Sequence, residues 1–157
     1  MNTSSQLFHS FILPGSPLAE RYPEDIVLMK RGEDGIYRFS ANFYTFIFPF
    51  SRAVAIFTMY FNALTLTSSV WQDEEYPWQH IIAVEISSSQ APIMIENQAC
   101  DCTLSRIYLQ IYQHDACRLG AYLKAMPIGS RDEAAITVPD SEIHHVRGRV
   151  RRLLRDY

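Results

Sequence analysis

The feature of this sequence that most constrains its fold is a series of short segments in which apolar and polar residues alternate. Residues 105–113 read SRIYLQIYQ, with isoleucine or leucine at every second position, and residues 37–43 alternate in the same way. Successive side chains of a strand point to opposite faces, so this pattern predicts strands that bury one face. Seven such segments, rich in aromatic and β-branched residues, follow one another: residues 25–31, 36–48, 52–61, 63–71, 80–88, 92–99 and 105–113.

Short turns between these segments predict antiparallel pairing. GEDG at residues 32–35 has the composition of a hairpin turn, and QDEE at residues 72–75 reads as an acidic loop. Pro49 and Arg52 interrupt the apolar stretch of residues 43–66. A membrane-spanning helix needs roughly 20 continuous apolar residues, so this stretch is better explained as two buried strands joined by a turn.

The apolar period lengthens after residue 113, which predicts two helices. In residues 115–126, apolar side chains recur at positions 116, 119, 123 and 126 behind Asp115 as an N-cap, and Pro127 follows. Residues 140–156 form the second expected helix, which is amphipathic. It separates an apolar stripe from a basic face: Ile143, Val146, Val150, Leu153 and Tyr157 for the stripe, and Arg147, Arg149, Arg151, Arg152 and Arg155 for the basic face.

We therefore expect an α+β fold that is mainly β, a seven-stranded antiparallel barrel or sandwich with one packing helix and a C-terminal basic helix. The chain has 157 residues, of which 48% are hydrophobic, and this is enough for one core. The expected organisation is an irregular N-terminal segment at 1–24, a β domain with its closing helix at 25–127, a linker at 128–139 and a C-terminal helix at 140–157.

Residues 53–87 resemble the GRAM and bacterial PH-like pattern. The match is carried by a strand with a central threonine, a leucine-containing strand and a segment that ends in Val-Glu: Thr58, Leu64, Leu66, Pro77, Trp78, Ile82, Val84 and Glu85. Seven antiparallel strands followed by a helix is also the element order of the PH-like superfold. The resemblance implies two nearly orthogonal sheets forming a barrel that a helix closes at one end. Asn62-Ala63 departs from the pattern, which has an arginine there, and the second helix is additional.

The first hairpin loop bears on whether such a domain would bind lipid. PH-like domains that bind phosphoinositides use basic residues in this loop, whereas Glu33 and Asp34 occupy it here. These carboxylates repel phosphates, although Lys30, Arg31 and Arg38 flank the turn. The resemblance therefore implies a protein-binding scaffold more than a reader of membrane lipid.

The charge of the chain is divided between its body and its tail. Residues 140–157 hold five arginines and three acidic residues, a net charge of +2, whereas residues 1–139 hold nine basic and fourteen acidic residues, a net charge of −5. A basic helix suits an anionic partner such as nucleic acid, and it equally suits docking on an acidic protein surface. The sequence leaves both alternatives open.

Four residues, Cys100, Cys102, His114 and Cys117, carry zinc-competent side chains. If the residues between the two pairs form one strand, eleven residues at about 3.3 Å each separate the pairs by roughly 35 Å. A tetrahedral site needs its ligands within about 4 Å of one another. The spacing therefore argues against zinc and favours buried thiols in a reduced protein.

The sequence contains no hydrolase, P-loop or dinucleotide-binding motif, and we expect no cofactor. The leading hypothesis is a non-enzymatic, cytoplasmic protein–protein interaction or scaffold module whose helix stripe docks on a protein partner or on a second copy. The alternative is a nucleic-acid-binding accessory or regulatory protein that uses the arginine face, with Tyr108 and Tyr112 as stacking platforms. A small enzyme or zinc protein at the cysteine and histidine cluster is the third and least favoured hypothesis.

Overall fold

The computed structural model of the chain describes residues 5–95, 97–127 and 141–156. Within these residues it contains nine strands, two α-helices and one 3-10 helix. In chain order the elements are β1 (Gln6–Phe11), α1 (Pro17–Glu20), β2 (Met29–Arg31), β3 (Tyr37–Phe39), β4 (Ala41–Pro49), β5 (Ala53–Asn62), β6 (Thr67–Pro77), η1 (Trp78–His80), β7 (Ile81–Ile95), β8 (Gln98–Ile111), β9 (Cys117–Pro127) and α2 (Ile143–Asp156). The expected mainly β class is confirmed, but the described residues form nine strands and not the seven expected.

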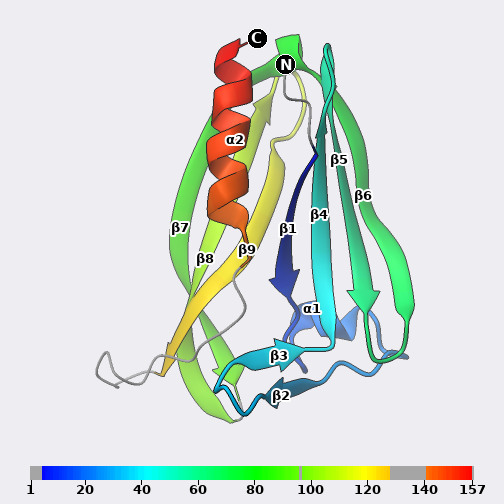
Figure 1. Cartoon of the computed structure of the whole chain (residues 1–157), viewed down its shortest axis with the longest axis vertical. Helices are drawn as coiled ribbons and strands as arrows, with labels where there is room; N and C mark the ends of the chain where they lie inside the picture. Colours follow the sequence, from blue (N-terminus) through cyan, green and yellow to red (C-terminus); the bar gives the residue numbers. More distant parts are fainter. Residues whose placement is uncertain (1–4, 96, 128–140, 157) are drawn as a thin grey trace.

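The strands pair antiparallel and form three sheets (Figure 1). The order of the four-stranded sheet is β1-β4-β5-β6, that of the three-stranded sheet is β7-β8-β9, and β2 and β3 form a separate hairpin. The antiparallel architecture with a C-terminal helix is therefore as expected. Hydrogen bonds do not join these sheets into a closed barrel within the part of the chain that the structure describes.

The main core lies between the two large sheets and is completed by α2, which lies next to β1 at one end of the molecule (Figure 1). Period-two alternation decides which side chains enter it, because every second residue of a strand points to the same face. In β5, for example, Val54 and Ile56 are buried and Ala55 between them is less so. The buried members of this cluster are Phe8, Ile47, Val54, Ile56, Trp78, Ile81, Ile107, Leu109, Ile111, Cys117, Leu119, Ala121, Ile143, Val146 and Val150.

Two expected turns are confirmed. The GEDG segment joins β2 to β3, where Gly35 has φ +79°, a left-handed conformation that glycine adopts without strain. The turn between β4 and β5 is closed by the Phe50 amide, which donates to the Ala53 oxygen at 2.8 Å. The apolar stretch of residues 43–66 is therefore a hairpin followed by a second turn, as its proline and arginine predicted.

The prediction of a helix at residues 115–126 is wrong. Cys117–Pro127 is strand β9, which pairs along most of its length with β8. Cys117, Leu119 and Ala121 are all buried, so the segment also carries a period-two pattern. β8 provides a long unpaired edge, and hydrogen bonding along that edge outweighs the local helical pattern.

Other expected boundaries also change. Residues 1–24 were expected to be irregular, but Gln6–Phe11 is a strand of the four-stranded sheet and Pro17–Glu20 is a short helix. The acidic segment at residues 72–75 lies within β6 and not in a loop. The strands expected at 80–88 and 92–99 are mostly one 15-residue strand, β7, which tolerates Pro92 because it is an edge strand.

Within the described residues, no helix combines the length and hydrophobicity that crossing a membrane requires. The linker expected at residues 128–139 lies outside these residues.

Candidate functional site

The apolar stripe of α2 is packed inside the chain itself. Ile143, Val146 and Val150 are 0%, 1% and 4% exposed and belong to the main core, and Leu153 packs against the same cluster. These side chains therefore cover the chain's own sheets, and the three buried ones offer no free surface to a partner, which differs from the expected docking mechanism. The fifth member of the stripe, Tyr157, lies outside the described residues.

The start of α2 is anchored to the four-stranded sheet. The His9 amide of β1 donates to the Ser141 oxygen at 3.1 Å, and Ser141 itself is buried. The Ser141 hydroxyl accepts from the Ile143 amide at 3.4 Å, so it satisfies a donor that the helix leaves unpaired. The helix therefore begins at Ile143, three residues later than expected, and its rotation about its axis is set by this anchor and by the buried stripe.

Burial of the stripe turns the arginines outward. Arg151, Arg152 and Arg155 are exposed, and Arg147 and Arg149 are half-buried. Neither Arg147, Arg151 nor Arg155 forms an ion pair with a carboxylate of the described residues. The Arg152 Nε donates to the Gly148 oxygen at 3.4 Å, which directs this side chain along the helix. The result is a cationic surface on which Arg147, Arg151 and Arg155 face no carboxylate of the described residues within ion-pair distance.

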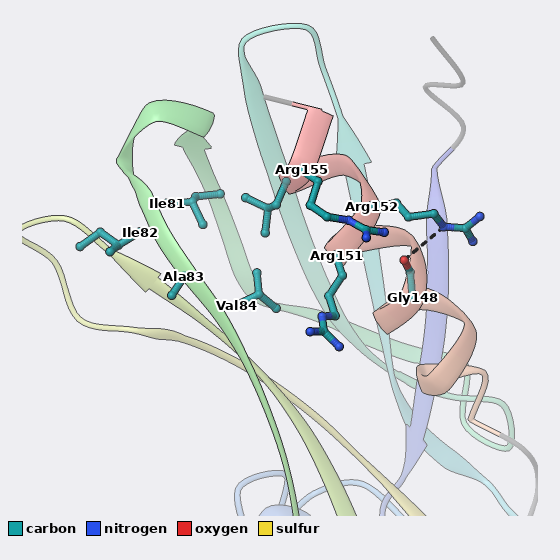
Figure 2. Close-up of a pocket in the computed structure, with 9 residues that line it drawn as sticks. Ile81, Ile82, Ala83, Val84, Gly148, Arg151, Arg152 and Arg155 are labelled. Atoms are coloured by element: carbon teal, nitrogen blue, oxygen red, sulfur yellow. Dashed lines mark hydrogen bonds between the residues drawn. The ribbon is translucent and has the colours of Figure 1, made fainter.

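An open groove of about 560 Å³ separates this surface from the start of β7. Figure 2 shows Arg151 on the side of α2 that faces β7, whereas Arg152 points away from the strand. Gly148 forms part of the helix wall, and no atom lies within 4 Å of where its Cβ would be, so this wall is open. The groove is lined by Ile81, Ile82, Ala83 and Val84 from β7 and by Gly148, Arg151, Arg152, Leu154 and Arg155 from α2.

The lining combines positive charge with apolar surface and contains no side chain for acid–base or nucleophilic chemistry. Ile82 is 65% exposed, so it is the most accessible apolar side chain on the β7 side of the groove. The nine lining residues include no serine, cysteine, histidine, aspartate or glutamate. Such a groove can hold an anion that also has an apolar part, but it supplies no catalytic group.

The two tyrosines expected to stack on bases occupy different places. Tyr112 is 56% exposed, and its amide donates to the His80 oxygen at 2.7 Å, immediately before the groove residue Ile81. Tyr108 lies on the outer face of the three-stranded sheet, where the Arg118 guanidinium lies 5.9 Å from its ring centre. Tyr112 is therefore next to the end of the groove, and Tyr108 belongs to the sheet surface.

The cysteine and histidine residues are not brought together. Cys100 and Cys102 pair with Pro127 and Ala125, whereas Cys117 pairs with Leu109 near the other end of β8. All three thiols are buried and none forms a disulfide, as expected of structural cysteines. Residues 5–95, 97–127 and 141–156 contain no group of three or more His, Cys, Asp or Glu side chains that could hold a metal ion.

One carboxylate of the acidic hairpin loop between β2 and β3, that of Asp34, is neutralised by an arginine of β3. Arg38 Nη2 lies 2.7 Å from Asp34 Oδ2, and Arg38 Nη1 donates to Asp34 Oδ1 at 2.9 Å. These hydrogen bonds hold the pKa of Asp34 well below its usual range. Arg38 is thus occupied by a carboxylate of its own loop, which leaves Lys30 and Arg31 as the exposed cations beside it.

Sequence patterns indicated the arginine face but missed the β7 wall of the groove. The available signal was Ile81-Ile82, two adjacent isoleucines of which a half-buried strand can turn only one inward. No protein-family model matches this chain, and neither a curated protein nor a solved structure is significantly similar to it.

Proposed function

We propose that this chain is a non-enzymatic nucleic-acid-binding protein that holds phosphates of a single strand on the arginine face of α2. The observation that carries the proposal is the burial of the apolar stripe, because it leaves the arginines as the accessible face of the helix. Guanidinium groups suit phosphates, since they present several N–H donors in a planar array. An expected accessory or regulatory role fits a chain whose groove holds no catalytic side chain.

The spacing of the arginines supports contact with an extended strand. Arg147, Arg151 and Arg155 succeed one another every four residues, about 6 Å along the helix axis, and form a row about 12 Å long. Contacts of this kind are largely independent of base sequence and weaken with salt. A second cationic set on the neighbouring turn, Arg149 and Arg152, widens the surface.

The groove favours a single strand over a duplex. Ile82, Ala83 and Val84 form an apolar wall opposite the arginines, and Tyr112 lies at its end. Unpaired bases expose apolar faces that can contact such side chains, whereas the bases of a duplex are stacked inside it. We therefore propose that the phosphates of the strand bind the arginines and that its bases contact the apolar side chains of β7.

The test is fluorescence anisotropy with single-stranded and duplex DNA and RNA across a salt series. We expect micromolar binding to single strands at low salt. Each phosphate contact contributes about 0.7 to the slope of log K against log salt. The triple variant Arg147→Ala/Arg151→Ala/Arg155→Ala removes three contacts and should therefore reduce the magnitude of this slope by about 2. The matched control removes three exposed cations elsewhere, Lys30→Ala/Arg31→Ala/Arg52→Ala, and should leave binding nearly unchanged.

Two outcomes would contradict the proposal. The first is no binding to any nucleic acid at low salt, in which case an acidic protein surface becomes the better candidate for the arginine face. The second is an equal loss of affinity in the control variant, which would assign the binding to net charge and not to α2. A preference for duplex would contradict the proposed role of the β7 wall.

We propose further that the fold is a variant of the PH-like superfold. The supporting features are antiparallel strands in two large sheets on either side of the main core and a C-terminal helix packed on that core. In this arrangement α2 takes the position of the closing helix that was expected at residues 115–126. An experimental structure in which the two sheets cross near right angles would support the relationship, and aligned sheets would contradict it.

A further inference from the structure

The outer face of the four-stranded sheet is mostly apolar, although the main core lies on its other side. Its polar residues are His9 in β1, Asn42 in β4 and Ser68, Asp73 and Glu75 in β6. In β4 and β5 the residues that alternate with the core positions point away from the three-stranded sheet. Together with outward residues of the two edge strands they form a surface that we call the aromatic face. Its members are Leu7, Tyr44, Phe46, Phe48, Phe57, Met59, Phe61 and Val70.

These side chains contact one another and remain accessible. The rings of Phe46 and Phe57 lie 6.3 Å apart, and those of Tyr44 and Phe61 lie 6.4 Å apart. At the margins Leu7 is 46% exposed and Val70 is 62% exposed. The aromatic face is therefore a continuous patch across all four strands, and soluble proteins rarely leave such a patch in contact with water.

The outer face of the three-stranded sheet provides an internal comparison. Several of its outward positions are polar or charged and hydrogen-bond to one another across β7 and β8, as in the bond from Arg106 Nη1 to the Ser89 hydroxyl at 2.9 Å. Gln110 likewise donates to the Glu85 carboxylate on the same face. One outer surface is thus suited to water and the other is suited to burial, so the apolar character of the aromatic face is not a general property of the chain.

The size and shape of the aromatic face fit a second copy of this chain. Four strands about 4.8 Å apart and about nine residues long cover roughly 20 Å by 30 Å, or about 600 Å² before the relief of the side chains is counted. A standard interface takes about 800 Å² from each partner. A gently twisted sheet face is also self-complementary, since two such faces pack about 10 Å apart with interdigitating side chains.

The acidic residues at one edge of the sheet favour one orientation of the two-fold axis that relates the two copies. Asp73 and Glu75 point outward on β6, next to the aromatic face, and no aspartate or glutamate lies on β1 at the opposite edge. A two-fold axis parallel to the strands sets β6 of one copy over β1 of the other, so the carboxylates of the two copies stay apart. An axis across the strands would stack β6 on β6 and oppose like charges.

We propose that the aromatic face is a homodimer interface, in which two four-stranded sheets pack face to face about a two-fold axis parallel to their strands. This interface is separate from α2, so it leaves the arginine grooves of both copies open. The dimer proposal does not depend on whether the chain binds nucleic acid. Self-association by this sheet also replaces the expected self-association by the helix stripe.

Sedimentation equilibrium of the full chain at about 1 to 100 µM tests the proposal. We expect a species at twice the 18.1 kDa mass of the chain. The variant Phe46→Thr/Phe57→Thr removes the centre of the face but keeps residues that suit strands, and it should weaken dimerisation at least tenfold. The matched control Tyr108→Thr changes an aromatic residue on the polar outer face and should leave the mass unchanged.

A second variant guards against loss of folding. Val70→Arg places a charge at a position that is 62% exposed, so it should preserve the circular dichroism spectrum and still weaken the dimer. A wild-type chain that stays monomeric at 100 µM would overturn the proposal and would point to a different protein as the occupant of the face. Folded Phe46→Thr/Phe57→Thr and Val70→Arg variants that remain fully dimeric would also overturn it.

Discussion

The indole Nε1 of Trp78 donates a hydrogen bond of 2.8 Å to the backbone oxygen of Phe50. Trp78 is 6% exposed, and its own amide donates to the Arg52 oxygen at 3.1 Å. These two bonds tie the β4–β5 turn to η1, the segment that leads from the four-stranded sheet into β7. Trp78 therefore links the four-stranded sheet to the connection that leads into the three-stranded sheet.

We predict that Trp78→Phe lowers the free energy of unfolding by about 1–2 kcal/mol, because it removes this donor and leaves a small void. Urea denaturation followed by circular dichroism measures the change. The control is Trp71→Phe, since Trp71 is 42% exposed and should affect stability much less. Equal effects of the two substitutions would show that the bond to Phe50 does not join the sheets.

Two glycine-to-alanine substitutions should have opposite effects. Gly148 lies within α2 with open space around its missing Cβ, so Gly148→Ala should stabilise the protein by about 0.5–1 kcal/mol. Gly35 has φ +79° in the β2–β3 turn, so Gly35→Ala should destabilise it by about 1 kcal/mol. Thermal denaturation measures both, and a destabilising Gly148→Ala would mean that another group already fills the groove beside the helix.

The carboxylate of Asp25 should make the stability depend on acid pH. It accepts hydrogen bonds from the hydroxyl of Tyr60, from Asn62 Nδ2 at 3.0 Å and from Thr65 Oγ1 at 2.6 Å. Burial is the largest single influence and raises the pKa of Asp25, but these bonds together outweigh it and hold the pKa below its usual value. Because the pKa of Asp25 is lower in the folded than in the unfolded chain, its carboxylate stabilises the fold at pH values above the unfolded-state pKa. This stability is lost as the pH falls through the folded-state pKa.

We therefore predict that the wild-type chain loses stability below about pH 4. Asp25→Asn should be less stable at pH 7 and should lose less stability between pH 4 and pH 2. Urea denaturation at several pH values measures both effects. Asp73→Asn, on the exposed part of β6, is the control. If Asp25→Asn and the wild type lose the same stability in acid, the hydrogen bonds of Asp25 do not contribute to the pH dependence of stability.

The thiol of Cys117 should be unreactive in the native state. Burial raises its pKa to about 11, so only a small fraction is thiolate at pH 8. Cys100 and Cys102 are also buried, each 0% exposed. We expect a thiol reagent at pH 8 to modify all three cysteines in guanidinium chloride but none within minutes in buffer. Rapid reaction of one native thiol would contradict its burial.

The sequence by itself determined the elements whose patterns are long and have a single period. The two faces of residues 37–43 and of β8 and the buried stripe of α2 were predicted correctly, because hydrophobic periodicity decides which side of an element is buried. The arginine face followed from the same helix, since it lies opposite the stripe. Separation of the cysteine pairs was likewise predicted, because a strand has a known length per residue.

The tertiary structure decided the features that depend on which element lies next to which. Residues 117–121 fit both a helical and a period-two pattern, and only the open edge of β8 makes them a strand. An apolar stripe such as that of α2 can be buried against a partner or against the chain's own core. Only the packing of α2 on the two sheets shows that it is buried in the core. The groove joins Ile82 to Arg151, two residues far apart in sequence, so no local pattern predicts it. Periodicity specifies the faces of each element, but contacts between distant elements decide what those faces meet.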